Sequence, residues 1–323
     1  MKSIENFRSY YNTELQPILK ELEEERIGSM RKTGIGATVI LGIAAILAAF
    51  ILNASLSPVA LLIPLVIGAA LVGGAWWLFT KDFKQHFKNS LIRQVIQYVD
   101  PSLAYTPAGK ISRYEFESST LFKHRIDRYR GEDLVDGQID KTKIRFSELH
   151  AEYKTTSTDS KGRRKTHWHT IFKGLFFIAD FNKHFHGRTV VLPDSAEKLF
   201  GRLGKKLQEW NLSRDDLINM EDVDFEKEFV VYGTDQIEAR YILSTALMRR
   251  ILEFKRKMKV PVHMAFVNSD LYMAISIKKN MFEPRLLRKI LDFEIVRDYL
   301  EDVILAVGIV EDLNLNTRIW TKE

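Results

Sequence analysis

The sequence predicts an α+β fold in which an N-terminal transmembrane helical hairpin is followed by a cytoplasmic mixed domain with antiparallel strands and long helices. Three observations predict it. No charged residue occurs between Lys32 and Lys81. Alternation of apolar and polar residues, which is typical of strands, is concentrated between Glu132 and Val191. Helix-capping signals and helical periodicity lie mainly outside that region, and such clustering of strands favours α+β over α/β.

The composition suits a packed core, because 46% of the 323 residues are hydrophobic and 28% are charged. The chain has no cysteine, which excludes a disulfide framework, a cysteine zinc site and a thiol nucleophile. Its formal net charge of +6 is typical of a nucleic-acid binder or of a domain beside an anionic leaflet. The uncharged stretch favours the second interpretation.

The uncharged stretch predicts a two-helix transmembrane hairpin over residues 33–79. Each apolar half, Thr33–Leu52 and Pro58–Phe79, has the roughly 20 residues that cross about 30 Å of hydrocarbon. Ser57 and Pro58 are typical of a helix start. A signal peptide is disfavoured because a long polar segment precedes the first half. The hydropathy likewise disfavours the alternative of a buried hairpin in a soluble protein.

Positive charge predicts the orientation of this hairpin. The connecting loop carries no cation, and by the positive-inside rule both termini are expected in the cytoplasm. Trp76 and Trp77 are expected at the cytoplasmic interface. The cations that flank the two apolar halves are Arg26, Arg31, Lys32, Lys81, Lys84, Lys88 and Arg93.

Small residues recur at four-residue spacing in both apolar halves, and such steps let helix backbones approach closely in lipid. This spacing leaves two interpretations open: packing within the hairpin, or packing between protomers in a homo-oligomer. The pairs are Thr38 with Gly42, Ala44 with Ala48, Ala69 with Gly73, and Ala70 with Gly74.

The chain is expected to divide into four parts. Apolar residues at helical spacing precede the hairpin, with Pro17 expected to kink or divide that helix, and a similar stripe after the hairpin ends at Val99. The parts are a cytoplasmic amphipathic segment at 1–32, the hairpin at 33–79, a juxtamembrane helix at 80–106, and a cytoplasmic α+β domain at 107–323, either undivided or split into subdomains at 107–210 and 211–323.

The elements of the cytoplasmic domain follow from periodicity and turn chemistry. The expected strands are Lys143–Tyr153, with a phase slip near Ser147 that indicates a bulge, Thr170–Phe181, Thr189–Leu192, Phe229–Tyr232, and a hairpin of Val262–Val267 with Leu271–Ile277. The expected helices begin at Asp194 and run to Trp210, begin at Asp235 and run as one long helix through Phe254, and extend from Pro284 to about Val310.

Several short strings resemble an uncharacterised bacterial membrane-protein family, domain of unknown function 3137. They include Phe172-Lys173-Gly174-Leu175, Ala179-Asp180-Phe181-Asn182-Lys183 and Asp235-Gln236-Ile237-Glu238-Ala239-Arg240-Tyr241. The resemblance runs from about residue 100 to the C-terminal end and implies a bacterial inner-membrane location. It transfers no catalytic residue. Relatives are often encoded near LemA-type membrane proteins, so the resemblance also implies such a protein as a partner.

The sequence contains neither a phosphate-binding Gly-rich loop nor a nucleophile elbow. We therefore expect no cofactor, and an enzyme is the less favoured class. Two histidine pairs each place their imidazoles on one face of an extended chain, with Asp180 or Glu148 as an oxygen ligand. These candidate metal ligands are His167, His169, His184 and His186.

A basic turn is the stronger candidate for a binding site. It places cations at the tip of a predicted hairpin, and each cation close to an anionic leaflet contributes about 1 kcal/mol. A solvated tip is the alternative, and nucleic-acid binding ranks third. The candidate lipid-binding residues are Lys161, Arg163, Arg164 and Lys165.

These observations favour a membrane-anchored cytoplasmic binding or scaffold protein that acts through protein partners at the inner membrane. The alternative is a membrane-tethered hydrolase or other enzyme with an unrecognised, metal-dependent site.

Overall fold

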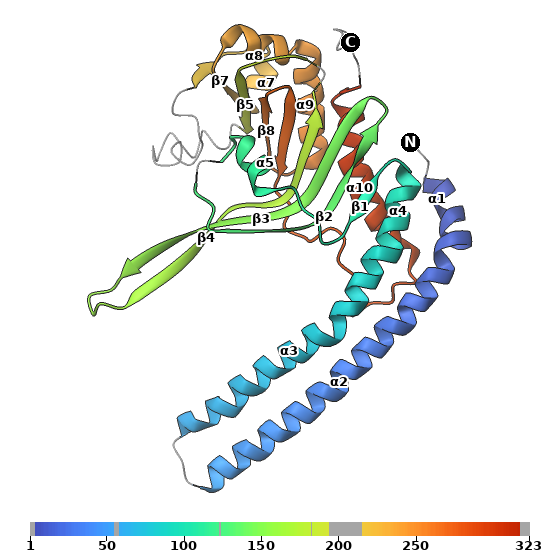
Figure 1. Ribbon diagram of the computed structural model, residues 1–323, viewed down its shortest axis with the longest axis vertical. Helices are drawn as coiled ribbons and strands as arrows, with labels where there is room; N and C mark the ends of the chain where they lie inside the picture. The colour runs from blue at the N-terminus through green and yellow to red at the C-terminus, as the bar shows by residue number, and fades with distance from the viewer. Residues whose placement is uncertain (1–3, 55–57, 123, 182, 194–214, 317–323) are drawn as a thin grey trace. The chain divides into compact units, whose positions relative to one another are not determined.

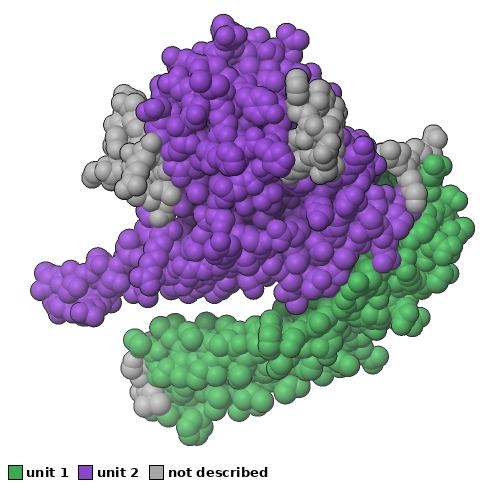
Figure 2. All heavy atoms as spheres, turned by 45° about the horizontal axis from the view of Figure 1, so that its top comes forward, with its two compact units in different colours: residues 1–95, 282–300 green, residues 96–281, 301–323 purple. Residues whose placement is uncertain are grey.

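The computed structural model describes residues 4–54, 58–122, 124–181, 183–193 and 215–316. Contacts within the chain divide it into two compact units (Figure 2). Unit 1 comprises residues 1–95 and 282–300, and unit 2 comprises residues 96–281 and 301–323. The helix predicted from Asp194 to Trp210 lies outside the described residues.

Unit 2 is built on one nine-stranded antiparallel sheet, which confirms the α+β class (Figure 1). Its strand order is β1-β2-β3-β4-β9-β8-β5-β7-β6, so β1 and β6 form the two edges. Strands from 107–210 and 211–323 share this sheet, with β5 of the first range between β8 and β7 of the second. The strands are β1 Ala104–Thr106, β2 Arg128–Ile139, β3 Thr142–Thr158, β4 Arg164–Asp180, β5 Arg188–Pro193, β6 Asp216–Ile218, β7 Phe229–Gly233, β8 Val262–Val267 and β9 Asp270–Ile275.

Apolar side chains are buried on both faces of the sheet. On β3, Phe146 and Leu149 are both buried although they project to opposite faces. One face carries an aromatic cluster in which Phe116 of α5 (Arg113–Ser118) packs on Phe172 and Phe176 of β4. Short helices α7 (Val223–Glu226) and α8 (Gln236–Ile242) and the longer α9 (Thr245–Met258) and α10 (Phe293–Asp312) complete the described helices of the C-terminal half.

The β8–β9 hairpin confirms its sequence prediction. Asn268 and Ser269 both have positive φ angles, of 52° and 67°, as a two-residue primed turn requires. The predicted bulge near Ser147 also exists, but the extra residue lies on the partner strand. Asp133 and Leu134 of β2 lie between the Glu132–Glu148 and Val135–Phe146 pairs, opposite Ser147, and Asp133 has a φ of 62°.

Two helix predictions were wrong. The long helix expected from Asp235 is divided into α8 and α9, because Ser244 provides a new N-cap by accepting a hydrogen bond from the Leu247 N–H. The helix expected from Pro284 begins only at Phe293, where the Asp292 carboxylate accepts a hydrogen bond from the Glu294 N–H.

Unit 1 is dominated by two long helical stretches that lie side by side (Figure 1). The first consists of α1 (Ile4–Tyr10), the π turn η1 (Tyr11–Leu15) and α2 (Gln16–Asn53). The second consists of η2 (Pro58–Leu61), α3 (Leu62–Phe87), the π turn η3 (Lys88–Ile92) and α4 (Arg93–Val99), whose last residues belong to unit 2.

The interruption predicted at Pro17 is the π turn η1, which ends just before α2 begins. Pro17 follows η1 directly and has no N–H to donate to a carbonyl of that turn. The backbone stays helical on both sides, since Leu15 and Gln16 have right-handed helical dihedrals, and the irregularity is confined to the five-residue turn Tyr11–Leu15.

Both helical stretches contain a segment long and apolar enough to span a membrane. Their large side chains are open to the surroundings, as at Ile46 and Phe50, which are 72% and 70% exposed. The two helices approach closely where a Cβ added at Gly68 would lie 3.4 Å from the Cβ of Ala44. Of the small residues singled out by spacing, Ala44 lies at this contact, whereas a Cβ added at Gly42, Gly73 or Gly74 meets no described atom within 4 Å.

A buried ion pair holds a remote segment of unit 1 against α2. Arg26 donates through Nε and Nη2 to the two carboxylate oxygens of Glu23, at 2.9 and 2.8 Å. Glu23 also accepts the N–H of Ile290 at 3.1 Å, and Arg26 Nη1 donates to the carbonyl of Leu286 at 2.7 Å. The hydrogen bonds from Arg26 hold the pKa of the Glu23 carboxyl below its usual range, although burial opposes this effect.

Replacing Glu23 with Gln should destabilise unit 1. The change leaves the Arg26 guanidinium, whose side chain is only 12% exposed, without its counter-charge. Breaking a buried pair in this way costs about 3–5 kcal/mol. Thermal unfolding of the full-length protein in detergent should show the loss. Glu24→Gln is the matched control, because Glu24 is exposed and such a change costs less than about 0.5 kcal/mol.

The stability that Glu23 provides should depend on pH. Because the pKa of Glu23 is lower in the folded than in the unfolded chain, its contribution to the free energy of unfolding is complete above the ordinary glutamate pKa. That contribution is lost as the pH falls through the lowered folded value. The stability difference between the wild type and Glu23→Gln should therefore shrink on acidification. Equal stabilities of the Glu23→Gln and Glu24→Gln variants at neutral pH would contradict the role of the pair.

Candidate functional site

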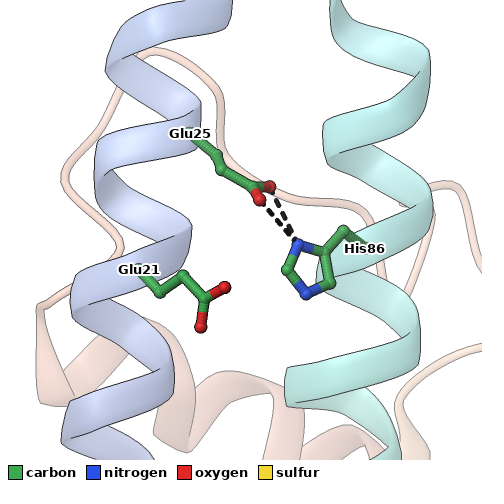
Figure 3. Close-up of side chains that lie close together, drawn as sticks. All are labelled: Glu21, Glu25 and His86. Carbon is green, nitrogen blue, oxygen red and sulfur yellow. Dashed lines mark hydrogen bonds and ion pairs between the residues drawn. The ribbon is translucent and has the colours of Figure 1, made fainter.

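Three side chains with metal-ligating atoms converge between the two long helices of unit 1 (Figure 3). Glu21 and Glu25 lie one turn apart on α2, and His86 lies on α3. Nδ1 of His86 is 2.9 Å from each carboxylate oxygen of Glu25. Glu21 lies one turn from this pair on the same side of α2, and one ligand atom from each of the three residues falls within 4.8 Å of the others.

The pairing of the two helices explains why these residues meet. In an antiparallel hairpin, residues equally far from the connecting turn lie at the same level. Gly36 and Ala75 meet in this way, since a Cβ added at Gly36 would lie 4.0 Å from the Cβ of Ala75. Glu25 and His86 are related by the same symmetry about the turn, eleven residues further from it on each helix.

This group was not among the sites predicted from the sequence. A signal for it existed in the Glu21 and Glu25 spacing of four residues, which places both carboxylates on one helix face. His86 could have been added only by assuming the hairpin register and counting outward from the turn.

A second acidic group, in unit 2, has a structural explanation. Glu132, Asp133 and Glu148 lie together at the β2 bulge. The carboxylate of Asp133 accepts a hydrogen bond from the buried Tyr105 hydroxyl, and that of Glu148 accepts the Met281 N–H at 3.0 Å. These bonds satisfy the carboxylates within the protein, so the group supports the bulge.

The predicted basic turn lies at the tip of a two-stranded ribbon formed by the outer parts of β3 and β4 (Figure 1). Lys161, Arg163, Arg164 and Lys165 are all exposed. Asp159 organises the turn, because its carboxylate accepts from the N–H groups of Lys161 and Arg163, both at 2.9 Å, and from Arg163 Nε at 3.0 Å. One of the four tip cations is therefore paired locally, and lipid binding by the tip stays a prediction.

The ribbon extends beyond the neighbouring strands of the sheet. Pairing of β2 with β3 reaches Glu152, and pairing of β9 with β4 begins at Leu175. Between these limits, within the described residues, β3 and β4 pair only with each other, out to Thr158 and Arg164. We call residues 153–170 the arm. No described strand pairs with either of its edges, and near its base the Lys154 N–H donates to the Asp127 carboxylate at 2.8 Å.

The arm carries one of the predicted histidine pairs. His167 and His169 alternate with Trp168 and lie on one face, where His169 stacks on Tyr153 at 4.8 Å and its Nε2 lies 2.8 Å from the Thr155 hydroxyl. Trp168 projects to the opposite face, where the Arg128 guanidinium lies 3.7 Å from its ring centroid.

The other predicted pair, His184 and His186, lies in the connection between β4 and β5. The N–H groups of His186 and Gly187 donate to the two carboxylate oxygens of Glu238, at 2.7 and 2.6 Å. Within the described part of the chain, neither histidine pair belongs to a group of three or more ligating side chains within 4.8 Å of one another. Metal binding by His167, His169, His184 and His186 therefore stays a prediction.

If the tip binds anionic headgroups, it should respond to lipid charge. A Ser160→Cys variant carrying an environment-sensitive dye would be placed in nanodiscs of anionic or neutral lipid. In anionic lipid the dye should be protected from the neutral quencher acrylamide. Protection should fall as salt rises, because the Debye length shortens from about 10 Å at 0.1 M to about 3 Å at 1 M.

Gln at Lys161, Arg163, Arg164 and Lys165 should abolish this protection. The matched control places Gln at four exposed cations elsewhere in unit 2, namely Lys110, Lys143, Lys173 and Arg256. If both quadruple variants reduce protection equally, the attraction comes from the whole charged domain. That result would remove the tip as a lipid site.

Comparisons with known proteins identify a domain but no activity. No curated protein matches the chain. Among solved structures, the crystal structure of the mycobacterial trehalose monomycolate transport factor A, TtfA, shows 11% sequence identity and a TM-score of 0.33, covering 66% of this chain and 92% of that chain. These values carry no argument about fold or function.

Residues 170–315 match the family described as "Protein of unknown function (DUF3137)". The match begins at β4 and extends through α10, a shorter range than the resemblance seen in the sequence. It excludes the two long apolar helices and most of the arm. From this match, the chain contains a DUF3137 domain at residues 170–315.

Proposed function

We propose that this chain is a membrane-anchored binding protein of the bacterial inner membrane. The two apolar helices form its anchor, both termini and unit 2 face the cytoplasm, and the arm contacts a protein partner. The arm supports the binding role, because it is an exposed two-stranded ribbon that leaves the sheet and, among the described residues, has no neighbouring strand on either edge.

The exposed apolar side chains of the two helices and the cations that flank them support the proposal that the helices form a membrane anchor. The apolar halves keep their large side chains on the outside, including Val59 at 69% and Leu65 at 67% exposure. A soluble protein rarely exposes so large a contiguous apolar surface. The Lys81 ammonium lies 5.5 Å from the ring centroid of Trp77, and this aromatic–cation pair at the end of the apolar segment is typical of a membrane interface. The absence of cations in the turn favours cytoplasmic termini.

The low intrinsic stability of the arm supports a role in contacting another protein. An isolated two-stranded ribbon is at best marginally stable in water, so the arm contributes little to the fold. Unpaired strand edges bind other chains by adding a strand, and soluble proteins usually cover or shorten such edges. The arm instead keeps Trp168 40% exposed. A LemA-type membrane protein is the partner class that the family resemblance adds to this proposal.

Shortening the arm should remove the partner and leave the fold intact. Thr155 and His167 are directly paired, so an Asn-Gly turn can replace residues 156–166 between them. The full-length wild type, purified from native membranes, should retain a co-purifying protein at constant stoichiometry. The shortened variant should lose it while keeping the melting temperature within a few degrees of wild type.

The quadruple Gln variant of the tip provides the matched control, because it keeps the ribbon backbone. It should retain the partner if strand edges provide the contact. Retention of the same protein by the shortened variant would refute the arm as the contact. Purification of the wild type without any stoichiometric partner would refute the binding role.

A further inference from the structure

We propose that Glu21, Glu25 and His86 bind one divalent transition-metal ion, of the chemical class of Zn²⁺ or Mn²⁺, and that this ion joins α2 to α3. The site lies on the segments of the two helices that continue beyond the apolar halves. It is independent of the proposed partner contact, because the arm belongs to unit 2.

The donor set matches this class of metal. Two carboxylates and one imidazole combine oxygen and nitrogen ligands, which suit zinc and neighbouring divalent ions. The ligands come from two helices, and Glu25 and His86 already face each other with Nδ1 2.9 Å from both carboxylate oxygens (Figure 3). Metal–ligand bonds of about 2.0–2.2 Å at tetrahedral angles place donor atoms about 3.4 Å apart. The ligand atoms that now lie up to 4.8 Å from one another must therefore move closer, and the 2.9 Å contact between Glu25 and His86 must open slightly. Side-chain rotation provides that adjustment, since these side chains are partly exposed.

The charge balance of the group favours a cation. Carboxylates at positions i and i+4 of a helix repel each other. The Glu25 carboxylate has His86 as its partner, whereas the Glu21 carboxylate makes no hydrogen bond or ion pair with any residue in the described part of the chain. The cations Lys84 of α3 and Lys88 of η3 pair instead with Glu283. A bound divalent ion would neutralise both carboxylates at once.

The contrast with the acidic group of unit 2 strengthens this assignment. There the carboxylates of Asp133 and Glu148 accept hydrogen bonds from Tyr105 and Met281, which accounts for their position. The helix group contains an imidazole and, among the described residues, a carboxylate without a protein partner. Three protein ligands also leave at least one position open for water or another ligand.

Zinc titration of the full-length protein, purified in detergent without a polyhistidine tag, tests the proposal. Isothermal calorimetry should give one Zn²⁺ per chain, and saturation should raise the melting temperature. Glu21→Gln removes a ligand but leaves the Glu25–His86 contact intact, so it should weaken binding by about tenfold or more. It should not change the melting temperature without metal.

Two control variants distinguish this site from nonspecific charge attraction and from the histidines of the arm. Glu24→Gln removes one charge from the same helix turn without removing a ligand and should bind like the wild type. The double variant His167→Gln, His169→Gln removes the competing imidazole pair and should also bind like the wild type. The proposal fails if the wild type binds no Zn²⁺, if Glu21→Gln binds as tightly as the wild type, or if only the double histidine variant loses binding.

Discussion

The close antiparallel pairing of the two apolar helices is the constraint on which the rest of unit 1 depends. A Cβ added at Gly68 would lie 3.4 Å from Ala44, and one added at Gly36 would lie 3.4 Å from the ring of Phe79. An alanine Cβ at either glycine would be in ordinary van der Waals contact, whereas side chains larger than alanine would crowd the facing helix. The register that the glycines permit continues outward along both helices, and it places His86 opposite Glu25.

A distant part of the chain secures the far ends of the same helices. Phe293 packs against Phe7 and Tyr11, with ring centroids 6.1 and 5.2 Å apart, and Tyr299 packs edge-on against Phe87 at 5.5 Å. Together with the Glu23–Arg26 pair, these contacts explain why residues 282–300 group with the helices. The aromatic contacts bury apolar surface. The ion pair fixes the orientation of the 282–300 segment on α2 through its hydrogen bonds to the backbone of Leu286 and Ile290.

The parts of the fold that were predictable from the sequence have local causes. A span in lipid needs a long uncharged run, and this requirement revealed both apolar helices. The β8–β9 turn was predictable because Asn268 tolerates positive φ and because Ser269 and Asp270 are residues that favour turns. The division between α8 and α9 was missed because apolar periodicity continues from Ile237 to Phe254, and the capping role of Ser244 was overlooked. The segment before α10 was misassigned because its conformation depends on contacts with α2, which local patterns do not contain.

The candidate site shows the same limit more strongly. Spacing of two residues placed His167 and His169 on one face, as predicted, but spacing alone cannot supply a third ligand from elsewhere in the fold. The group that does converge joins residues 61 positions apart in sequence. It becomes visible only when the helix register is known. The basic tip was located correctly from the sequence, whereas the local pairing of Arg163 with Asp159 depends on the turn geometry.

We expect the apolar hairpin to cross the inner membrane and to leave both helix ends and unit 2 on the cytoplasmic side. Single cysteines at Ser9, Ala54 and Ser160 test it directly in intact cells, because the native chain contains no cysteine. A membrane-impermeant maleimide should label Ala54→Cys in the turn and leave Ser9→Cys and Ser160→Cys unlabelled until the membrane is permeabilised. Labelling of Ser9→Cys or Ser160→Cys in intact cells, with Ala54→Cys protected, would contradict the claim.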